Sequence, residues 1–177
     1  ARMRLRRRAA DAAVAVRPVP FQDLGGAAGQ LHQRLGQPHH RGAQRHFAPV
    51  GAGSLERDLA RIRRVREAIG PDLALMVDAN HAYDAVAAIR LGRLIEPHDI
   101  GWFEEPVPPE DIAGYRAVKS ALSIPVAGGE CEFTRFGFRD LFASHALDIA
   151  QPDTCAAGGL TECKKIADMS EAFGIRY

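Results

Sequence analysis

The sequence predicts an α/β fold: a partial (β/α)8 TIM-type barrel with parallel strands over residues 51–177. Three observations support this prediction. Short apolar runs alternate with longer amphipathic stretches, an order that produces parallel strands joined by right-handed crossovers. Each apolar run is followed closely by a carboxylate. The spacing between these carboxylates matches the length of one strand-plus-helix unit.

Residues 1–50 differ from the rest of the chain because they are rich in Arg, Ala, Gly and His and show no periodicity. We expect irregular or disordered structure there, and the composition also suits a stretch translated out of frame. A basic arm can bind nucleic acid, but no aromatic residues interleave with these arginines as in RNA-binding motifs. We therefore expect no nucleic-acid partner.

The first predicted helix runs from Ser54 to about Ile69. Ser54 suits the N-cap position, apolar residues recur at helical spacing along one stripe, and Gly70-Pro71 ends the pattern. The next run, "LALMVDAN", is too short for a helix and suits a buried strand.

The alternation then continues to the end of the chain. Helices are predicted over 83–97, 111–122, 135–146 and 158–174, and strands over 100–106, 124–130 and 147–153, with a further strand beginning at 175.

Four carboxylates follow consecutive predicted strands: Asp78, Glu104, Glu130 and Asp153, at steps of 26, 26 and 23 residues. The carboxyl ends of barrel strands meet at one rim, which is where such barrels place their active sites. Crowded carboxylates repel one another unless a cation neutralises them, and Mg2+ prefers oxygen ligands of this kind. The alternative, that the four acids only cap helices, remains open at this point.

The motifs "MVDAN", "WFEEP", "GGE" and "IAQPD", in this order and spacing, resemble the enolase superfamily, and most closely its mandelate racemase/muconate lactonising branch. The resemblance implies that Asp78, Glu104 and Glu130 bind Mg2+, and that Asp153 partners a catalytic His on the next strand. It also implies proton abstraction next to a substrate carboxylate, with the metal ion stabilising the resulting enediolate.

Neighbouring polar residues supply further candidates. Glu104 and Glu105 compete for the metal role, since successive strand residues face opposite sides, and the resemblance favours Glu104. Asn80, His81 and Glu132 are candidate substrate-binding residues at the rim. For His81, an exposed loop position without a role in binding is at least as open an interpretation, and for Glu132 that interpretation is favoured.

The resemblance also sets an expectation that this sequence does not meet. The branch carries a Lys-x-Lys base at the end of the strand before that of Asp78, where Phe47-Ala48-Pro49 stands here. The catalytic His is expected just beyond Tyr177. Two functions follow: an acid-sugar dehydratase or cycloisomerase acting on a small-molecule carboxylate, or a catalytically inactive metal-binding half-barrel.

The bulk composition adds only coarse limits. Three cysteines with no Cys-x-x-Cys pair indicate reduced thiols in a cytoplasmic protein. No apolar run reaches the roughly 18 residues of a membrane span, so no membrane partner is expected. A homo-oligomer is compatible with the sequence.

Overall fold

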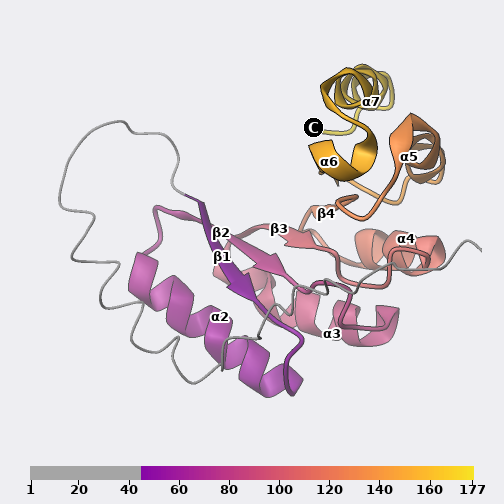
Figure 1. Ribbon diagram of the computed structural model, residues 1–177. Helices are drawn as coiled ribbons and strands as arrows, with labels where there is room; N and C mark the ends of the chain where they lie inside the picture. The colour runs from indigo at the N-terminus through magenta and orange to yellow at the C-terminus, as the bar shows by residue number, and fades with distance from the viewer. Residues whose placement is uncertain (1–44) are drawn as a thin grey trace, which may run out of the picture. The chain divides into compact units, whose positions relative to one another are not determined.

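The computed structural model describes residues 45–177, which form a parallel five-stranded sheet with helices packed along one face (Figure 1). The elements in chain order are β1 (Arg45–Pro49), α2 (Leu55–Ile69), β2 (Ala74–Asp78), α3 (Ala85–Ile95), the 3-10 helix η2 (Glu96–His98), β3 (Ile100–Glu104), α4 (Ile112–Ala121), β4 (Val126–Gly128), α5 (Thr134–Ala143), β5 (Ile149–Ala150), α6 (Thr154–Ala157) and α7 (Leu160–Ala172).

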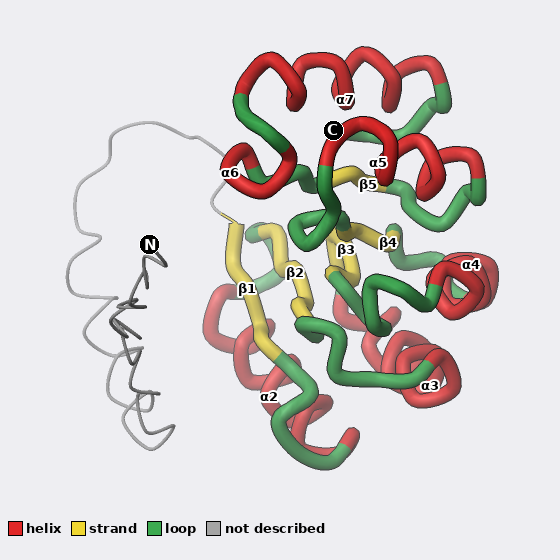
Figure 2. The backbone as a smooth tube through the Cα atoms, turned by 45° about the vertical axis from the view of Figure 1, so that its right-hand side comes forward, coloured by secondary structure: helices red, strands yellow, loops and turns green. Residues whose placement is uncertain are grey.

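The strands lie in the sheet in the same order as in the chain, and every pairing is parallel. A last bridge joins Ile149 to Arg176, where the sequence predicts a new strand. Figure 2 shows the helices on the outside of the curve that the strands form. This arrangement confirms the predicted α/β fold and matches part of a TIM barrel.

Strand alternation separates two faces of the sheet. Leu75, Val77 and Phe103 belong to the hydrophobic core between the strands and the helices, and all three are fully buried. Asp78 and Glu104 lie one residue further along β2 and β3, so they face the opposite, inner side. The carboxylates at the ends of β2 and β3 therefore lie together on the inner side of the sheet.

Local signals explain most element boundaries. Ser54 caps α2 by accepting a hydrogen bond from the Arg57 N–H, as its position in the sequence predicts. Gly70 follows the helix with a φ of 76°, a conformation suited to glycine. The predicted helix over 158–174 is preceded by the short helix α6, and Gly158 and Gly159, both at positive φ, separate α6 from α7.

The start of the sheet lies upstream of the boundary predicted at residue 50. Residues 45–49 form β1, which pairs with β2 in register from Arg45↔Ala74 to Pro49↔Asp78. The remainder of the predicted irregular segment, residues 1–44, lies outside the described residues. Within residues 45–177, no helix has the length and apolar character needed to cross a membrane.

Candidate metal-binding site

Two of the predicted metal ligands stand side by side at the carboxyl edge of the sheet. Asp78 and Glu104 are register partners on β2 and β3. Asp78 Oδ1 accepts a hydrogen bond of 2.9 Å from the Asn80 backbone N–H. Glu104 is only 9% exposed, and its Oε2 accepts one of 2.8 Å from the indole N–H of Trp102, two residues earlier on the same face. The indole thus fixes the direction of the Glu104 carboxylate.

The third predicted ligand, Glu130, lies in the turn after β4 and is exposed. The turn depends on Gly129, which has a φ of 116°, and a Cβ there would stand 2.7 Å from a ring atom of Phe138. The carboxylate oxygens of Asp78, Glu104 and Glu130 do not all lie within 4.8 Å of one another. Among residues 45–177, only the ligand atoms of His81, Glu105 and Cys131 do.

Glu105 has a different environment from Glu104. It is 2% exposed, and its Oε2 lies 2.7 Å from His81 Nε2. Its backbone carbonyl also accepts a 2.8 Å hydrogen bond from the His81 N–H. Burial raises the pKa of Glu105, and the hydrogen bond from His81 opposes that rise. Glu105 therefore holds the loop after β2, whereas Glu104 faces the inner side of the sheet beside Asp78; the choice of Glu104 as the metal ligand stays a prediction.

The other candidates take separate positions around the edge. Asn80 is exposed, with a left-handed φ of 42°. Glu132 Oε1 accepts a hydrogen bond from the Phe133 N–H within its own turn. Asp153 caps α6, since its Oδ1 accepts hydrogen bonds from the N–H groups of Cys155 and Ala156. Asp153 therefore has a structural role as a helix cap, which was the alternative interpretation of the strand-end acids.

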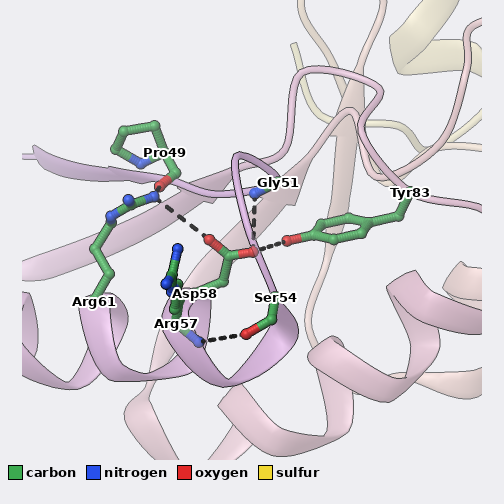
Figure 3. A network of polar contacts seen from close by, with 7 residues as sticks. All are labelled: Pro49, Gly51, Ser54, Arg57, Asp58, Arg61 and Tyr83. Atoms are coloured by element: carbon green, nitrogen blue, oxygen red, sulfur yellow. Dashed lines mark hydrogen bonds and ion pairs between the residues drawn. The ribbon is translucent and has the colours of Figure 1, made fainter. Parts of the chain in front are cut away.

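A buried carboxylate, Asp58 on α2, positions the loop after β1 (Figure 3). Its Oδ2 accepts hydrogen bonds from the Gly51 N–H at 3.1 Å and from the Tyr83 hydroxyl at 2.7 Å. Arg61 donates to Asp58 Oδ1 at 3.4 Å and to the Pro49 carbonyl at 2.7 Å. The network fixes the end of β1 against the loop that follows β2.

The end of β1 carries no titratable group on the inner face. Ala48 is fully buried toward the helices, whereas Phe47 and Pro49 are exposed on the other side. The Phe47 ring packs edge-on against Trp102 with 5.9 Å between ring centroids. The apolar side chains of Phe47 and Pro49 thus occupy the inner positions where the resemblance leads us to expect lysines.

The charges at the carboxyl edge fit a divalent cation. None of Asp78, Glu104 and Glu130 forms an ion pair with a basic side chain of the described residues. The buried side-chain amide oxygen of Gln151, just past β5, has no hydrogen-bond partner among the described residues. A buried carboxylate with only a neutral partner is costly unless a cation balances it. All three donors are carboxylates, the type that Mg2+ prefers.

Several contacts at this edge could not be found from the sequence. The position of Cys131 beside His81, the Trp102–Glu104 hydrogen bond and the Asp58–Tyr83 pair each depend on how successive loops approach. The only local signal is the spacing of Trp102 and Glu104, which places both side chains on one face of a strand.

Comparison with known families identifies this arrangement. The model described as "Enolase C-terminal domain-like" matches residues 33–177. The chain belongs to the enolase superfamily. The match lies in the C-terminal domain of its mandelate racemase/muconate lactonising branch and begins upstream of residue 50, where the sequence predicts the domain boundary.

Individual relatives of this enolase-superfamily chain are sugar-acid enzymes. D-galactarolactone cycloisomerase of Agrobacterium fabrum is 47% identical over 127 residues, which is 72% of this chain and 33% of that protein. The structure of 3,6-anhydro-D-galactonate cycloisomerase from Zobellia galactanivorans is 51% identical with a TM-score of 0.73, covering 75% of this chain and 37% of the other. L-talarate dehydratase from Polaromonas sp. JS666, complexed with Mg and L-glucarate, is 35% identical with a TM-score of 0.71, covering 73% and 36%. The chain thus spans about a third of the length of the curated relatives it matches.

Proposed function

We propose that this chain carries the Mg2+-binding face of an acid-sugar dehydratase or cycloisomerase, with Asp78, Glu104 and Glu130 as the ligands. The observation that carries the proposal is Glu104, a nearly buried carboxylate in register with Asp78 and without a basic partner among residues 45–177. Bound Mg2+ polarises a substrate carboxylate and makes the neighbouring C–H bond more acidic.

The chain's own residues then have distinct tasks. Trp102 orients Glu104 through its indole N–H, and Gly129 permits the turn that presents Glu130. Asn80, His81 and Glu132 are proposed to bind the hydroxyl groups of a small acid sugar or its lactone. Asp153, held by its cap on α6, is proposed to orient a catalytic His. The names of the relatives support this substrate class.

A second candidate function is metal binding without turnover, and one observation favours it. Phe47 and Pro49 occupy the inner face at the end of β1, and neither side chain can accept a proton. General acid–base catalysis needs a titratable group within hydrogen-bond reach of the substrate proton. The inner end of β1 therefore supplies no base, whereas the proposed metal ligands on β2, β3 and the β4 turn are unaffected.

Mg2+ titration of the purified chain by calorimetry tests the metal site. Glu104→Gln removes one ligand charge and should weaken Mg2+ binding by at least about 10–100-fold, the loss typical of disturbing even the partners of metal ligands. Glu67→Gln, on the exposed surface of α2, is the matched control and should leave the affinity unchanged. Equal affinities for the Glu104 variant and the unmodified chain would remove Glu104 from the site.

Turnover separates the two candidate functions. The chain is incubated with Mg2+ and a panel of aldonic acids, aldaric acids and their lactones, and products are followed by NMR in deuterated water. Dehydration, isomerisation or exchange of the proton next to the carboxylate supports the enzymatic function. Mg2+ binding without any of these supports the non-catalytic candidate.

A further inference from the structure

His81, Glu105 and Cys131 form a compact cluster at the same edge as the proposed Mg2+ ligands. They come from the loops after β2, β3 and β4, and their ligand atoms all lie within 4.8 Å of one another. His81 Nε2 lies 2.7 Å from Glu105 Oε2 and 3.7 Å from Cys131 Sγ. Within residues 45–177, no other group of His, Cys, Asp and Glu side chains is gathered this closely.

The cluster is held firmly on one side and accessible on the other. Glu105 is nearly buried, and the His81 side chain is 21% exposed. The backbone hydrogen bond from His81 to the Glu105 carbonyl links the two loops directly. Cys131 is an exposed free thiol. Beside the cluster lies a cavity of about 10 Å3, lined in part by Glu105, Tyr115 and Cys131, which is about the space of one water molecule.

The donor atoms select a class of metal ion. An imidazole nitrogen, a thiolate sulfur and a carboxylate oxygen are the three ligand types of Zn2+, whereas Mg2+ binds oxygen almost alone. Three protein ligands, of which His81 and Cys131 are accessible to solvent, match a four-coordinate site whose remaining position is open to water. Tetrahedral Zn2+ holds its nitrogen and oxygen ligands about 3.4 Å apart, so the 2.7 Å contact between His81 and Glu105 must open by about 0.7 Å, a change that the partly exposed His81 ring can supply.

The surroundings also favour a cation. Three carboxylates lie close to the Cys131 thiol: Glu105 belongs to the same cluster, and Glu130 and Glu132 flank Cys131 in the chain. Their negative field stabilises a divalent ion placed at the thiol, because charges of opposite sign attract most strongly at a partly desolvated edge.

We propose that His81, Glu105 and Cys131 bind a borderline divalent cation, best matched by Zn2+, at a second metal site separate from Asp78, Glu104 and Glu130. An ion there joins the loops after β2, β3 and β4. While the ion is bound, the His81 ring serves as its ligand, so metal binding here competes with the role proposed above for His81 in holding a substrate hydroxyl.

Co2+ is a suitable probe, because a cobalt–thiolate bond adds a charge-transfer absorption band in the near ultraviolet. The 177-residue chain is titrated with Co2+ in saturating Mg2+. We expect the band to saturate at one ion per chain and Zn2+ to displace it. Absence of the band would show that the cluster is only an ion pair with a neighbouring thiol, and would overturn the proposal.

Variants assign the ligands. Cys131→Ser should abolish the thiolate band, and His81→Gln should weaken Co2+ binding by at least about tenfold. Cys155→Ser, which removes the other exposed thiol, is the matched control and should retain the band. A band that persists in Cys131→Ser or disappears in Cys155→Ser contradicts the assignment. Far-ultraviolet circular dichroism confirms that each variant is folded.

A second measurement does not depend on absorption. Zn2+ should protect Cys131 but not Cys155 from alkylation, as read by mass spectrometry of peptides, and equal labelling with and without Zn2+ would overturn the proposal. Glu104→Gln distinguishes the two metal sites. This variant should lose Mg2+ affinity and retain the cobalt band. Unchanged Mg2+ affinity would contradict only the proposed Mg2+ site, and loss of the band in this variant would contradict only the separateness of the second site.

Discussion

Asp58 shows how a single side chain can govern the geometry of the sheet edge. It is fully buried on α2 and is satisfied by Gly51, Tyr83 and Arg61, each from a different part of the chain. Removing one partner of a buried carboxylate leaves that group short of a hydrogen bond, which costs more than the bond itself contributes. The loops after β1 and β2 therefore depend on this contact.

Tyr83→Phe should lower the free energy of unfolding by about 1.5–3 kcal/mol, the range for hydrogen bonds to charged groups. Burial and the neighbouring Asp58 raise the pKa of Tyr83 above its ordinary range, so the hydroxyl stays a donor throughout the usual pH range. Urea unfolding measures the effect. The control is Tyr177→Phe, at an exposed ring whose hydroxyl bonds the Cys163 thiol, a weak partner, so this change should cost clearly less, about 0.5 kcal/mol. A similar loss in both variants would argue against the Asp58 network as the cause.

At this scale the sequence predicts positions better than contacts. The spacing of Asp78, Glu104 and Glu130 indicates one edge of a sheet, and the structure places all three there. The proximity of Cys131 to His81 is different in kind, because it depends on the paths of two loops separated by 50 residues. Neither loop has a periodic pattern from which its path could be inferred.

Among the elements, Glu96 at the start of η2 joins two βα units. Its Oε1 accepts hydrogen bonds from the Ser123 backbone N–H at 2.7 Å and from the Ser123 hydroxyl at 2.8 Å. The backbone N–H of Ser123 is the larger cause of a lowered pKa of Glu96, and its hydroxyl is the second. The end of α4 is thereby held against the end of α3.

The sign of the pH dependence follows from that direction. A carboxylate whose pKa is lower in the folded state stabilises the fold at pH values above its unfolded pKa of 4.5. This contribution is lost as the pH falls through the pKa of the folded state. Glu96→Gln should cost about 1 kcal/mol at pH 7, after allowance for solvent screening, and little below pH ~3. Thermal unfolding from pH 3 to 7 measures the difference. Glu171→Gln, at an exposed site, should show no comparable trend.

Helices are predicted more accurately than strands, for physical reasons. The helix predicted from Ser54 to about Ile69 is confirmed as α2, because a cap, an apolar stripe and a terminal Gly-Pro all agree. The strand predicted over 147–153 shortens to β5, Ile149–Ala150. Strand length depends on pairing with neighbours, which a single run of residues does not contain.

For the molecule as a whole, Phe103 is the side chain around which the layers pack. It is fully buried on β3, between the helices and the centre of the sheet. Phe103→Ala should lower the free energy of unfolding by about 3–5 kcal/mol, through lost burial and the cavity left behind. Phe136→Ala, at a side chain 55% exposed, is the matched control and should have a small effect.

Two signals from the same denaturant titration test whether the described residues unfold together. The single Trp of the sequence, Trp102, lies on the inner face, so its fluorescence reports the sheet edge, while circular dichroism reports the helices. Coincident transitions are expected for one cooperative unit. A separate fluorescence transition would mean that the sheet edge opens on its own.

The fold class is the level at which sequence is most informative. Repeated strand-plus-helix units predict parallel pairing, and that prediction is confirmed by the five strands of the sheet. The residues of β1 have no strong strand pattern of their own, because "RHFAP" contains Pro49, and only the family resemblance places the end of a strand at Phe47-Ala48-Pro49. The pairing of β1 with β2, rather than its own propensity, determines that it is a strand.

The order β1-β2-β3-β4-β5 has a consequence for how the chain acquires its structure. Each strand docks on the one synthesised immediately before it, so the segment that must close is never longer than one βα unit. The entropy of closing such a segment is modest and nearly the same at every step. Folding can therefore proceed from the N-terminal units onward during translation, with each completed strand serving as the template for the next.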